Sequence, residues 1–257
     1  MKKLYCLYAL IICIFTAQSE IKMVRSQPPA EQSAINIGYI SLTKPIEDFN
    51  DIVRSLKKHA DDPSIDCIVL HINSPGGYPG DSQVIADFIV WAKQTKPVIA
   101  FISNSGTSGA YWIAAACTWI IAPETAHIGS IGVVSELPKK NPNITFTAGR
   151  YKRPHYLGKG VIDPEDAQVI QERLDLTFDI FCENISKLRT IPVEVIRGLE
   201  AQVFLASQAV ELGLIDETGT IQQVFDKTVE LVSYRKGSAP ELLRVIASPT
   251  ELFEFAL

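Results

Sequence analysis

Two stretches of this sequence repeat the same three-part pattern, and the repeat constrains the fold more than any other feature. Residues 65–72 and 97–102 are rich in β-branched and other apolar residues, which predicts two strands buried in a sheet. Each strand leads into a turn of small residues, at 73–77 and 103–109, and then into a helical pattern. Successive strand–turn–helix units predict a parallel α/β sheet. Because right-handed crossovers return the chain in the same direction, we expect both turns at one edge of that sheet.

The remaining segments fit the same class of fold. Apolar spacing predicts helices at 47–60, from 81 onward, at 164–189 and at 221–232, and short strands at 35–40, 119–122 and 128–134. We expect one domain over residues 34–235, preceded by a linker at 26–33 and followed by a C-terminal extension at 236–257. The apolar seam of the helix at 164–189 predicts either intrachain core or a seat for a second subunit.

The N-terminal 25 residues read as an export signal. Lys2 and Lys3 precede an apolar run at 4–17, and polar residues follow it. The run is shorter than the roughly 20 residues that span a bilayer, but no clear cleavage site follows. The segment is therefore either a cleaved signal peptide or a short membrane anchor, and both predict a membrane-associated or exported protein with its domain outside the cytoplasm.

Charge and cysteine content exclude several other classes. The formal net charge is −5 and no long basic run occurs, which argues against a nucleic-acid partner. Cys67, Cys117 and Cys182 each lie in an apolar pattern, without the paired spacing of a disulfide framework or a zinc site. We expect them to be buried as small hydrophobic residues, and we expect no metal or cofactor.

Ser108 lies where the second strand–turn unit passes into an Ala-rich helix. Its hydroxyl has two plausible roles: an N-cap that accepts the first free amides of the helix, or a nucleophile. The glycines at 76 and 77 also have two interpretations. They form either a plain tight turn or an oxyanion hole whose amides point at a substrate carbonyl.

A nucleophilic serine needs a base. His59 and His71 fall in a predicted helix and strand and look structural, whereas His127 and His155 lie where they can reach a site. The other choice is a neutral lysine, whose pKa must be lowered from about 10.4 by apolar surroundings. Lys152 follows a strand-like run and lies away from acidic residues, whereas Lys139, Lys140 and Lys159 look like solvated loop residues.

Several sequence blocks together resemble the signal peptide peptidase A (SppA) family in order and spacing, in its short single-domain form. The blocks are Asn-Ser-Pro-Gly-Gly at 73–77, Ser-Gly-Thr-Ser-Gly-Ala-Tyr-Trp-Ile-Ala at 105–114, Ala-Pro-Glu-Thr at 122–125, Ile-Gly-Ser-Ile-Gly-Val at 128–133 and Gln-Ala-Val-Glu-Leu-Gly-Leu-Ile-Asp at 208–216. The resemblance covers roughly residues 35–232.

The resemblance implies a ClpP/crotonase-like fold of stacked strand-strand-helix units and a serine endopeptidase with a Ser-Lys dyad. By that resemblance Ser108 is the nucleophile and Lys152 the general base. The amides of Gly76 or Gly77 and of Gly109 form the oxyanion hole, with Ser130 hydrogen-bonded to the lysine. The implied substrates are membrane-associated peptides such as cleaved, hydrophobic signal-peptide remnants. A homo-oligomer is also implied, in which the serine and the lysine can come from neighbouring protomers.

Three alternatives stay open on the sequence. A ClpP-like Ser-His-Asp peptidase would use His127 as its base. A crotonase-type acyl-CoA enzyme would use the same oxyanion geometry, and a catalytically silent membrane scaffold would use none of it.

Overall fold

The computed structural model describes residues 33–135, 164–237 and 243–246, which all belong to the compact unit Gln32–Leu257. The strands are β1 (Ser33–Leu42), β2 (Cys67–Ser74), β3 (Val98–Thr107), β4 (Trp119–Ala122), β5 (His127–Gly129), β6 (Val203–Leu205), β7 (Glu217–Thr218) and β8 (Leu243–Ile246). The helices are α1 (Asn50–Asp61), α2 (Pro79–Ala92), α3 (Gly109–Ala115), α4 (Pro164–Arg189), α5 (Val193–Gly198), α6 (Ala206–Glu211) and α7 (Ile221–Lys236). The predicted signal or anchor at 1–25 lies outside the described residues. Among those described, no helix has the length and apolar character needed to cross a membrane.

The strands form a largely parallel sheet in the order β6-β5-β3-β2-β1-β8. Strands β1, β2 and β3 pair in parallel, and β3 pairs in parallel with β4 along its first half and with β5 near its end. Antiparallel pairing occurs between β5 and β6. The predicted α/β class with a parallel sheet is therefore confirmed.

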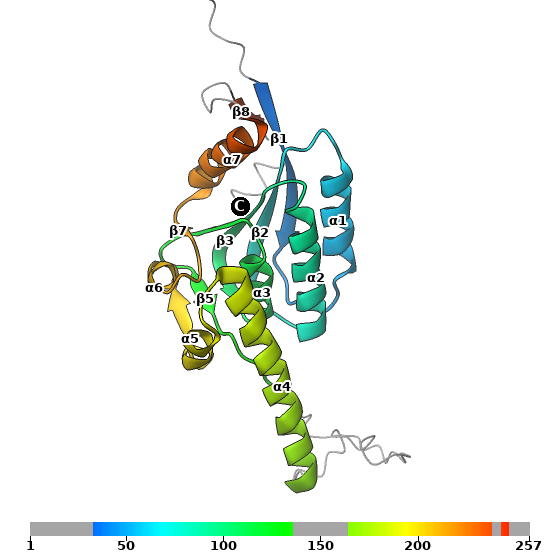
Figure 1. Ribbon diagram of the computed structural model, residues 1–257, viewed down its shortest axis with the longest axis vertical. Coiled ribbons are helices and arrows are strands. Elements are labelled where there is room, and N and C mark those ends of the chain that lie inside the picture. Colours follow the sequence, from blue (N-terminus) through cyan, green and yellow to red (C-terminus); the bar gives the residue numbers. More distant parts are fainter. Residues whose placement is uncertain (1–32, 136–163, 238–242, 247–257) are drawn as a thin grey trace, which may run out of the picture. The chain divides into compact units, whose positions relative to one another are not determined.

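Two hydrophobic clusters occupy the two faces of the sheet. The larger contains the even-numbered side chains of β2, such as Ile68 and Leu70, with the buried faces of α1, α2 and α3. The smaller contains Val69 of β2 and packs against Val224 and Val232 of α7. Figure 1 shows α1 and α2 side by side on one side of the strands and α7 on the other. This alternation follows from the period of two along a strand.

Strand β3 is longer than the apolar run that predicted it. It continues beyond Ile102 to Thr107, and its pairing with β2 changes register between Ile72↔Ile102 and Ser74↔Gly106. β3 therefore has two more residues than β2 over this interval, which is a bulge. Both β2 and β5 pair with this polar end of β3, so its backbone groups are hydrogen-bonded in the sheet. The strand therefore continues although its sequence lacks the apolar residues typical of a buried strand.

Two other boundaries also differ from the sequence pattern. The predicted strand at 128–134 is reduced to β5, which ends at Gly129. Strand β8 lies in the segment predicted as a C-terminal extension, and it pairs in parallel with the start of β1, from Ser33↔Leu243 to Asn36↔Ile246.

The three cysteines of the domain are buried and free, as predicted. Burial raises the pKa of the Cys67 and Cys117 thiols to about 12 and that of Cys182 to about 11. Thiols with such pKa values carry almost no thiolate at neutral pH, which agrees with a packing role rather than a redox role.

Candidate active site

The turns that follow β2 and β3 meet at one edge of the sheet, as the crossover argument predicts. Gly76 has a φ of +100°, and a Cβ at this position would lie 2.7 Å from the amide nitrogen of Gly109 and 2.8 Å from Cβ of Ser108. Only a residue without a side chain fits here, both for its backbone conformation and for the space available. The glycine turn thus brings its backbone directly against the Ser108–Gly109 peptide.

Ser108 adopts a backbone conformation that is rare for a residue with a side chain, with φ 53° and ψ −129°. It occupies the N-cap position of α3, but its hydroxyl makes no capping hydrogen bond. The capping interpretation is therefore wrong for its side chain. Strain of this kind, in a residue between a strand and a helix, is found where a nucleophile is presented to a substrate.

Backbone hydrogen bonds hold Ser108 in this conformation. Its amide donates to the carbonyl oxygen of Gly129 at 2.8 Å, and its own carbonyl accepts from the amides of Tyr111 and Trp112 in α3. The Tyr111 hydroxyl, buried within the domain, donates to the carbonyl of Leu214 at 2.7 Å. The serine is thus tied to β5 on one side and, through α3, to the end of the α6 segment on the other.

The amides of Gly76, Gly77 and Gly109 lie in the backbone around Ser108 and differ in whether they are engaged. The Gly76 amide donates to Ser74 Oγ at 3.2 Å. For the amides of Gly77 and Gly109, no hydrogen bond is described within the part of the chain that the structure covers. These two amides have the chemistry of an oxyanion hole, which needs backbone donors that are not already engaged.

A segment distant in sequence fixes the glycine turn. The Ile46 amide donates to the carbonyl of Gly76 at 2.9 Å, and its carbonyl accepts from the Tyr78 amide at 2.8 Å. A Cβ at Gly77 would overlap the backbone of Ile46. The turn is therefore held between residues 45–47 and the start of α3.

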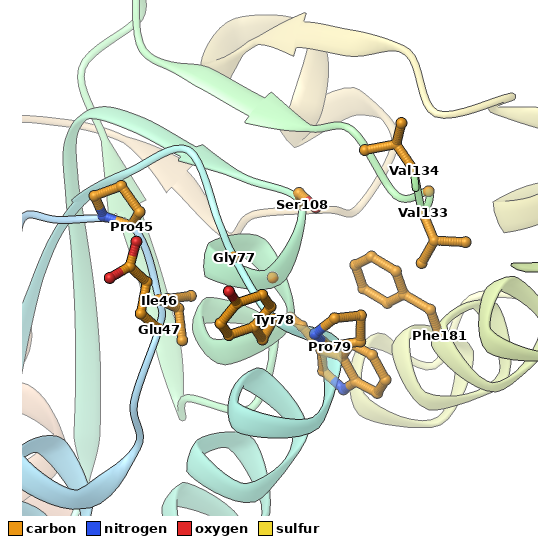
Figure 2. Close-up of a pocket in the computed structure, with 13 residues that line it drawn as sticks. Pro45, Ile46, Glu47, Gly77, Tyr78, Pro79, Ser108, Val133, Val134 and Phe181 are labelled. Atoms are coloured by element: carbon orange, nitrogen blue, oxygen red, sulfur yellow. The ribbon is translucent and has the colours of Figure 1, made fainter. Parts of the chain in front are cut away.

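A pocket of about 300 Å³ opens at Ser108. Figure 2 shows Pro45, Ile46 and Glu47 on one side of Ser108, and Val133, Val134 and Phe181 on the other. The walls are mostly apolar, and the lining residues are Pro45, Ile46, Glu47, Gly77, Tyr78, Pro79, Ser108, Gly109, Trp112, Gly132, Val133, Val134 and Phe181. Such a cavity suits an apolar side chain of a substrate next to the serine.

Trp112 and Phe181 join α3 to α4 at this pocket. Their rings stack with centroids 4.4 Å apart and an angle of 10° between the planes, and both side chains are buried. The C-terminal half of α4 packs on the domain in this way, with Phe181, Cys182 and Ile185 all buried. Of the apolar seam predicted along α4, Phe181 and Ile185 are buried, whereas Leu174 and Phe178 are only half-buried, so the domain covers the seam only in part.

The other predicted site residues are placed as follows. Ser130 directly follows Gly129, the residue whose carbonyl accepts from the Ser108 amide, and it has a positive φ of 52°. His127 is exposed on β5 and does not line the pocket. Lys152 lies outside the described residues, as does His155, so their roles stay predictions.

His71, which looked structural in the sequence, is part of a hydrogen-bonded row across three strands. Its Nδ1 lies 2.9 Å from the Tyr39 hydroxyl, and its Nε2 lies 2.8 Å from Ser103 Oγ. Burial lowers the pKa of His71 below its ordinary value. The row lies on the α7 side of the sheet, because His71 alternates with Leu70 and Ile72 of the larger cluster.

Sequence reasoning missed most of the pocket wall. Residues 45–47 contact the glycine turn from 31 positions away, for which no local sequence signal exists. Trp112 and Phe181 were recognised only as parts of a motif and of an apolar seam, and the pairing of their rings requires the fold.

Comparison with known proteins identifies the family of the chain. The model of "Peptidase family S49" matches residues 91–235, which include α3 and Phe181. The chain is 31% identical to "Protease 4" of Haemophilus influenzae over 201 residues, covering 73% of this chain and 32% of that protein. It is 30% identical to "Putative signal peptide peptidase SppA" of Enterococcus faecium over 190 residues, which cover 68% of this chain and 54% of that protein. It is 29% identical to "Capsid assembly protease C" of Escherichia phage lambda over 184 residues, which cover 66% of this chain and 40% of that protein.

The chain thus spans between about a third and a little over half of the length of these relatives. The family match, which covers more than half of the chain, also accords with the expected ClpP/crotonase-like arrangement of parallel strands and helices. This chain belongs to peptidase family S49.

Proposed function

We propose that this protein is a serine endopeptidase in which Ser108 is the nucleophile and Lys152 the general base. The observation that carries the proposal is the position of Ser108, held at a positive φ beside two available glycine amides and at the opening of an apolar pocket. Membership of a peptidase family supports the same reaction.

The proposed reaction is an acyl transfer in two steps. The Ser108 hydroxyl gives its proton to the neutral amine of Lys152 while its oxygen attacks the carbonyl carbon of the scissile peptide. The amides of Gly77 and Gly109 donate to the oxygen that becomes negative, and the lysine then passes the proton to the leaving amine. Water, deprotonated by the lysine, hydrolyses the acyl-enzyme and restores the serine.

Ser130 supports the base in this proposal. It is anchored through its amide, which donates to the carbonyl of Gln202 at 2.9 Å. With its backbone fixed there, its hydroxyl can hold the amine of Lys152 by a hydrogen bond. Gly76 contributes its conformation, because its φ of +100° sets the direction of the following Gly77 amide.

We propose hydrophobic peptides at a membrane, such as remnants of cleaved signal peptides, as the substrates. The apolar walls formed by Val133, Trp112 and Phe181 support an apolar substrate side chain. The N-terminal apolar run supports a location of the domain on the extracytoplasmic side of a membrane, either as an exported protein or through an anchor. A homo-oligomer completes the proposal, since Lys152 can act on the Ser108 of a neighbouring protomer.

Serine-directed labelling tests this function. A fluorophosphonate should label the purified full chain on the peptide that contains Ser108, and Ser108→Ala should abolish both labelling and peptide cleavage. Ser55→Ala, which changes a half-buried serine of α1 outside the pocket, is the matched control and should change neither. Absence of labelling and turnover in a folded protein would refute the proposal and favour a silent scaffold.

The base is tested separately. Lys152→Ala and Lys152→Arg should each abolish cleavage while the protein stays folded, because neither can accept the serine proton at neutral pH. Full activity of Lys152→Ala combined with loss of activity in His127→Ala would transfer the role to His127. Turnover of an acyl-CoA without serine labelling would instead favour the crotonase-type chemistry.

A further inference from the structure

The active-site pocket contains one carboxylate among mostly apolar walls. Of the lining residues, Glu47 alone carries a formal charge at neutral pH, and its side chain is exposed at the pocket rim. Among the described residues it has no ion-pair partner, whereas eight other ion pairs are formed within the same part of the chain. The neighbouring acid, Asp48, is engaged locally, accepting from the amide and side chain of Asn50.

Hydrogen bonds of the neighbouring backbone fix where residue 47 lies relative to the glycine turn. Glu47 follows Ile46, whose amide and carbonyl are both hydrogen-bonded to the glycine turn, at 2.9 Å to Gly76 and 2.8 Å to Tyr78. The same turn provides the Gly77 amide. Glu47 therefore lies next to the segment that holds the proposed oxyanion hole, and it lines the same pocket as Ser108.

Within residues 33–135, 164–237 and 243–246, no hydrogen bond or ion pair engages the Glu47 carboxylate. In Figure 2 the carboxylate of Glu47 lies toward Pro45, on the opposite side of Ser108 from Val133 and Phe181. An exposed glutamate changes rotamer within nanoseconds, so it can reach a cation at several places along this side. A carboxylate next to a low-dielectric apolar wall attracts a cation more strongly than one surrounded by water.

We propose that Glu47 selects peptides that carry a lysine or arginine close to the apolar residue that fills the pocket. This role rests on the proposed peptidase function, for which Glu47 would be a specificity-determining residue. The apolar walls hold the uncharged side chain, and the Glu47 carboxylate pairs with the cation on the other side of Ser108. Peptides of this composition occur where the basic region of a signal peptide meets its apolar run.

The test uses a set of peptides that share one apolar sequence and differ at a single position. Lysine, norleucine or glutamate is placed in turn at each of the three positions on either side of the scissile bond, and kcat/KM is measured for the full chain. At one or two positions, we expect lysine to exceed norleucine by about two- to five-fold and glutamate to be the poorest, as for a partly exposed ion pair. The preference should shrink as salt is added.

Variants then assign the preference to the residue. Glu47→Gln should bring the lysine-to-norleucine ratio close to one, and Glu47→Lys should reverse the order so that the glutamate peptide is preferred to the lysine peptide. Asp48→Asn removes the adjacent exposed charge outside the pocket and should retain the wild-type ratio. If Glu47 had only a structural role, its variants would lower kcat/KM for all peptides by a similar factor and would not reverse the order of preference.

The outcomes separate this inference from the peptidase proposal. If the norleucine peptide is cleaved but the ratio is the same in wild type and in Glu47→Lys, the inference is wrong and the peptidase function stands. If no peptide is cleaved and Ser108 is not labelled, the peptidase proposal is wrong, and the inference that rests on it is wrong as well. If the lysine-to-norleucine ratio falls to one in Asp48→Asn but not in Glu47→Gln, then Asp48 makes the selection and the inference is wrong.

Discussion

Gly109 and Ser82 lie so close together that position 109 cannot carry a side chain without movement of α2 or α3. A Cβ at Gly109 would overlap Ser82 Oγ and lie 3.0 Å from Ser82 Cβ, and it would lie 3.4 Å from the Gly77 amide nitrogen. Ser82 is fully buried and its hydroxyl donates to the Tyr78 carbonyl at 2.9 Å, so it cannot simply rotate away. This contact sets how near Ser108 lies to the glycine turn.

Gly109→Ala should therefore impair catalysis more than folding. The added methyl group pushes the start of α3 away from α2 and so displaces both the serine and the Gly109 amide, and a displacement near 1 Å can cost about 100-fold in rate. We expect kcat/KM for peptide cleavage to fall by about that factor. The matched control is Gly80→Ala in α2, where a Cβ would meet nothing within 4 Å. Equal losses in the two variants would show that the Gly109–Ser82 contact does not set the geometry.

Phe181→Ala should change both stability and substrate choice. It removes a buried ring stacked on Trp112 at 4.4 Å, which costs about 3–5 kcal/mol of unfolding free energy. It also removes part of the pocket wall, so the ratio of kcat/KM for peptides with large rather than small apolar residues should rise. Urea unfolding and a peptide series measure the two effects.

The control for this variant is Phe101→Ala, which also removes a buried phenylalanine but in the smaller cluster on the α7 side of the sheet. It should lower the free energy of unfolding and leave the substrate ratio unchanged. A shift of the ratio in Phe101→Ala as large as in Phe181→Ala would mean that the pocket wall does not determine it.

Local signals explain why part of this site could be predicted from the sequence. Apolar runs, glycine turns and right-handed crossovers suffice to bring Gly76 and Ser108 to one sheet edge, because each is a property of neighbouring residues. The extension of β3 through polar residues could not be predicted this way, since its hydrogen bonds come from β2 and β5. The contact of Ile46 with the glycine turn likewise depends on the fold, and the place of Lys152 stays a prediction.

Asp216→Ala should destabilise the domain strongly. Arg189 and Asp216 form an ion pair at 2.9 Å with side chains only 10% and 19% exposed, and Asp216 also accepts from the Ile120 amide at 2.7 Å. Removing the carboxylate leaves a buried guanidinium without its partner, for which the expected cost is about 3–5 kcal/mol. Chemical denaturation measures it. Asp51→Ala, which breaks an exposed pair with Arg54, should cost less than about 1 kcal/mol. Similar costs for the two variants would contradict a structural role of the buried pair.

His71 should make the domain less stable as the pH falls below about 6.5. Burial lowers the pKa of this histidine in the folded protein below its value of about 6.5 in an unfolded chain. Between these two pKa values the unfolded state binds more protons, so the free energy of unfolding decreases as pH decreases through this window. Above the window the contribution is fully present. The slope attributable to His71 should be a fraction of the roughly 1.4 kcal/mol per pH unit for one proton, because the half-buried ring is partly solvated.

The measurement is urea unfolding at intervals of half a pH unit between pH 5 and 7.5, for wild type and His71→Asn. The difference between the two curves isolates this histidine from the carboxylates that titrate in the same range. His127→Asn is the control for removal of an imidazole, because His127 is exposed on β5 and lies outside the row from Tyr39 to Ser103. A wild-type slope retained in His71→Asn would show that the row from Tyr39 to Ser103 does not couple folding to this proton.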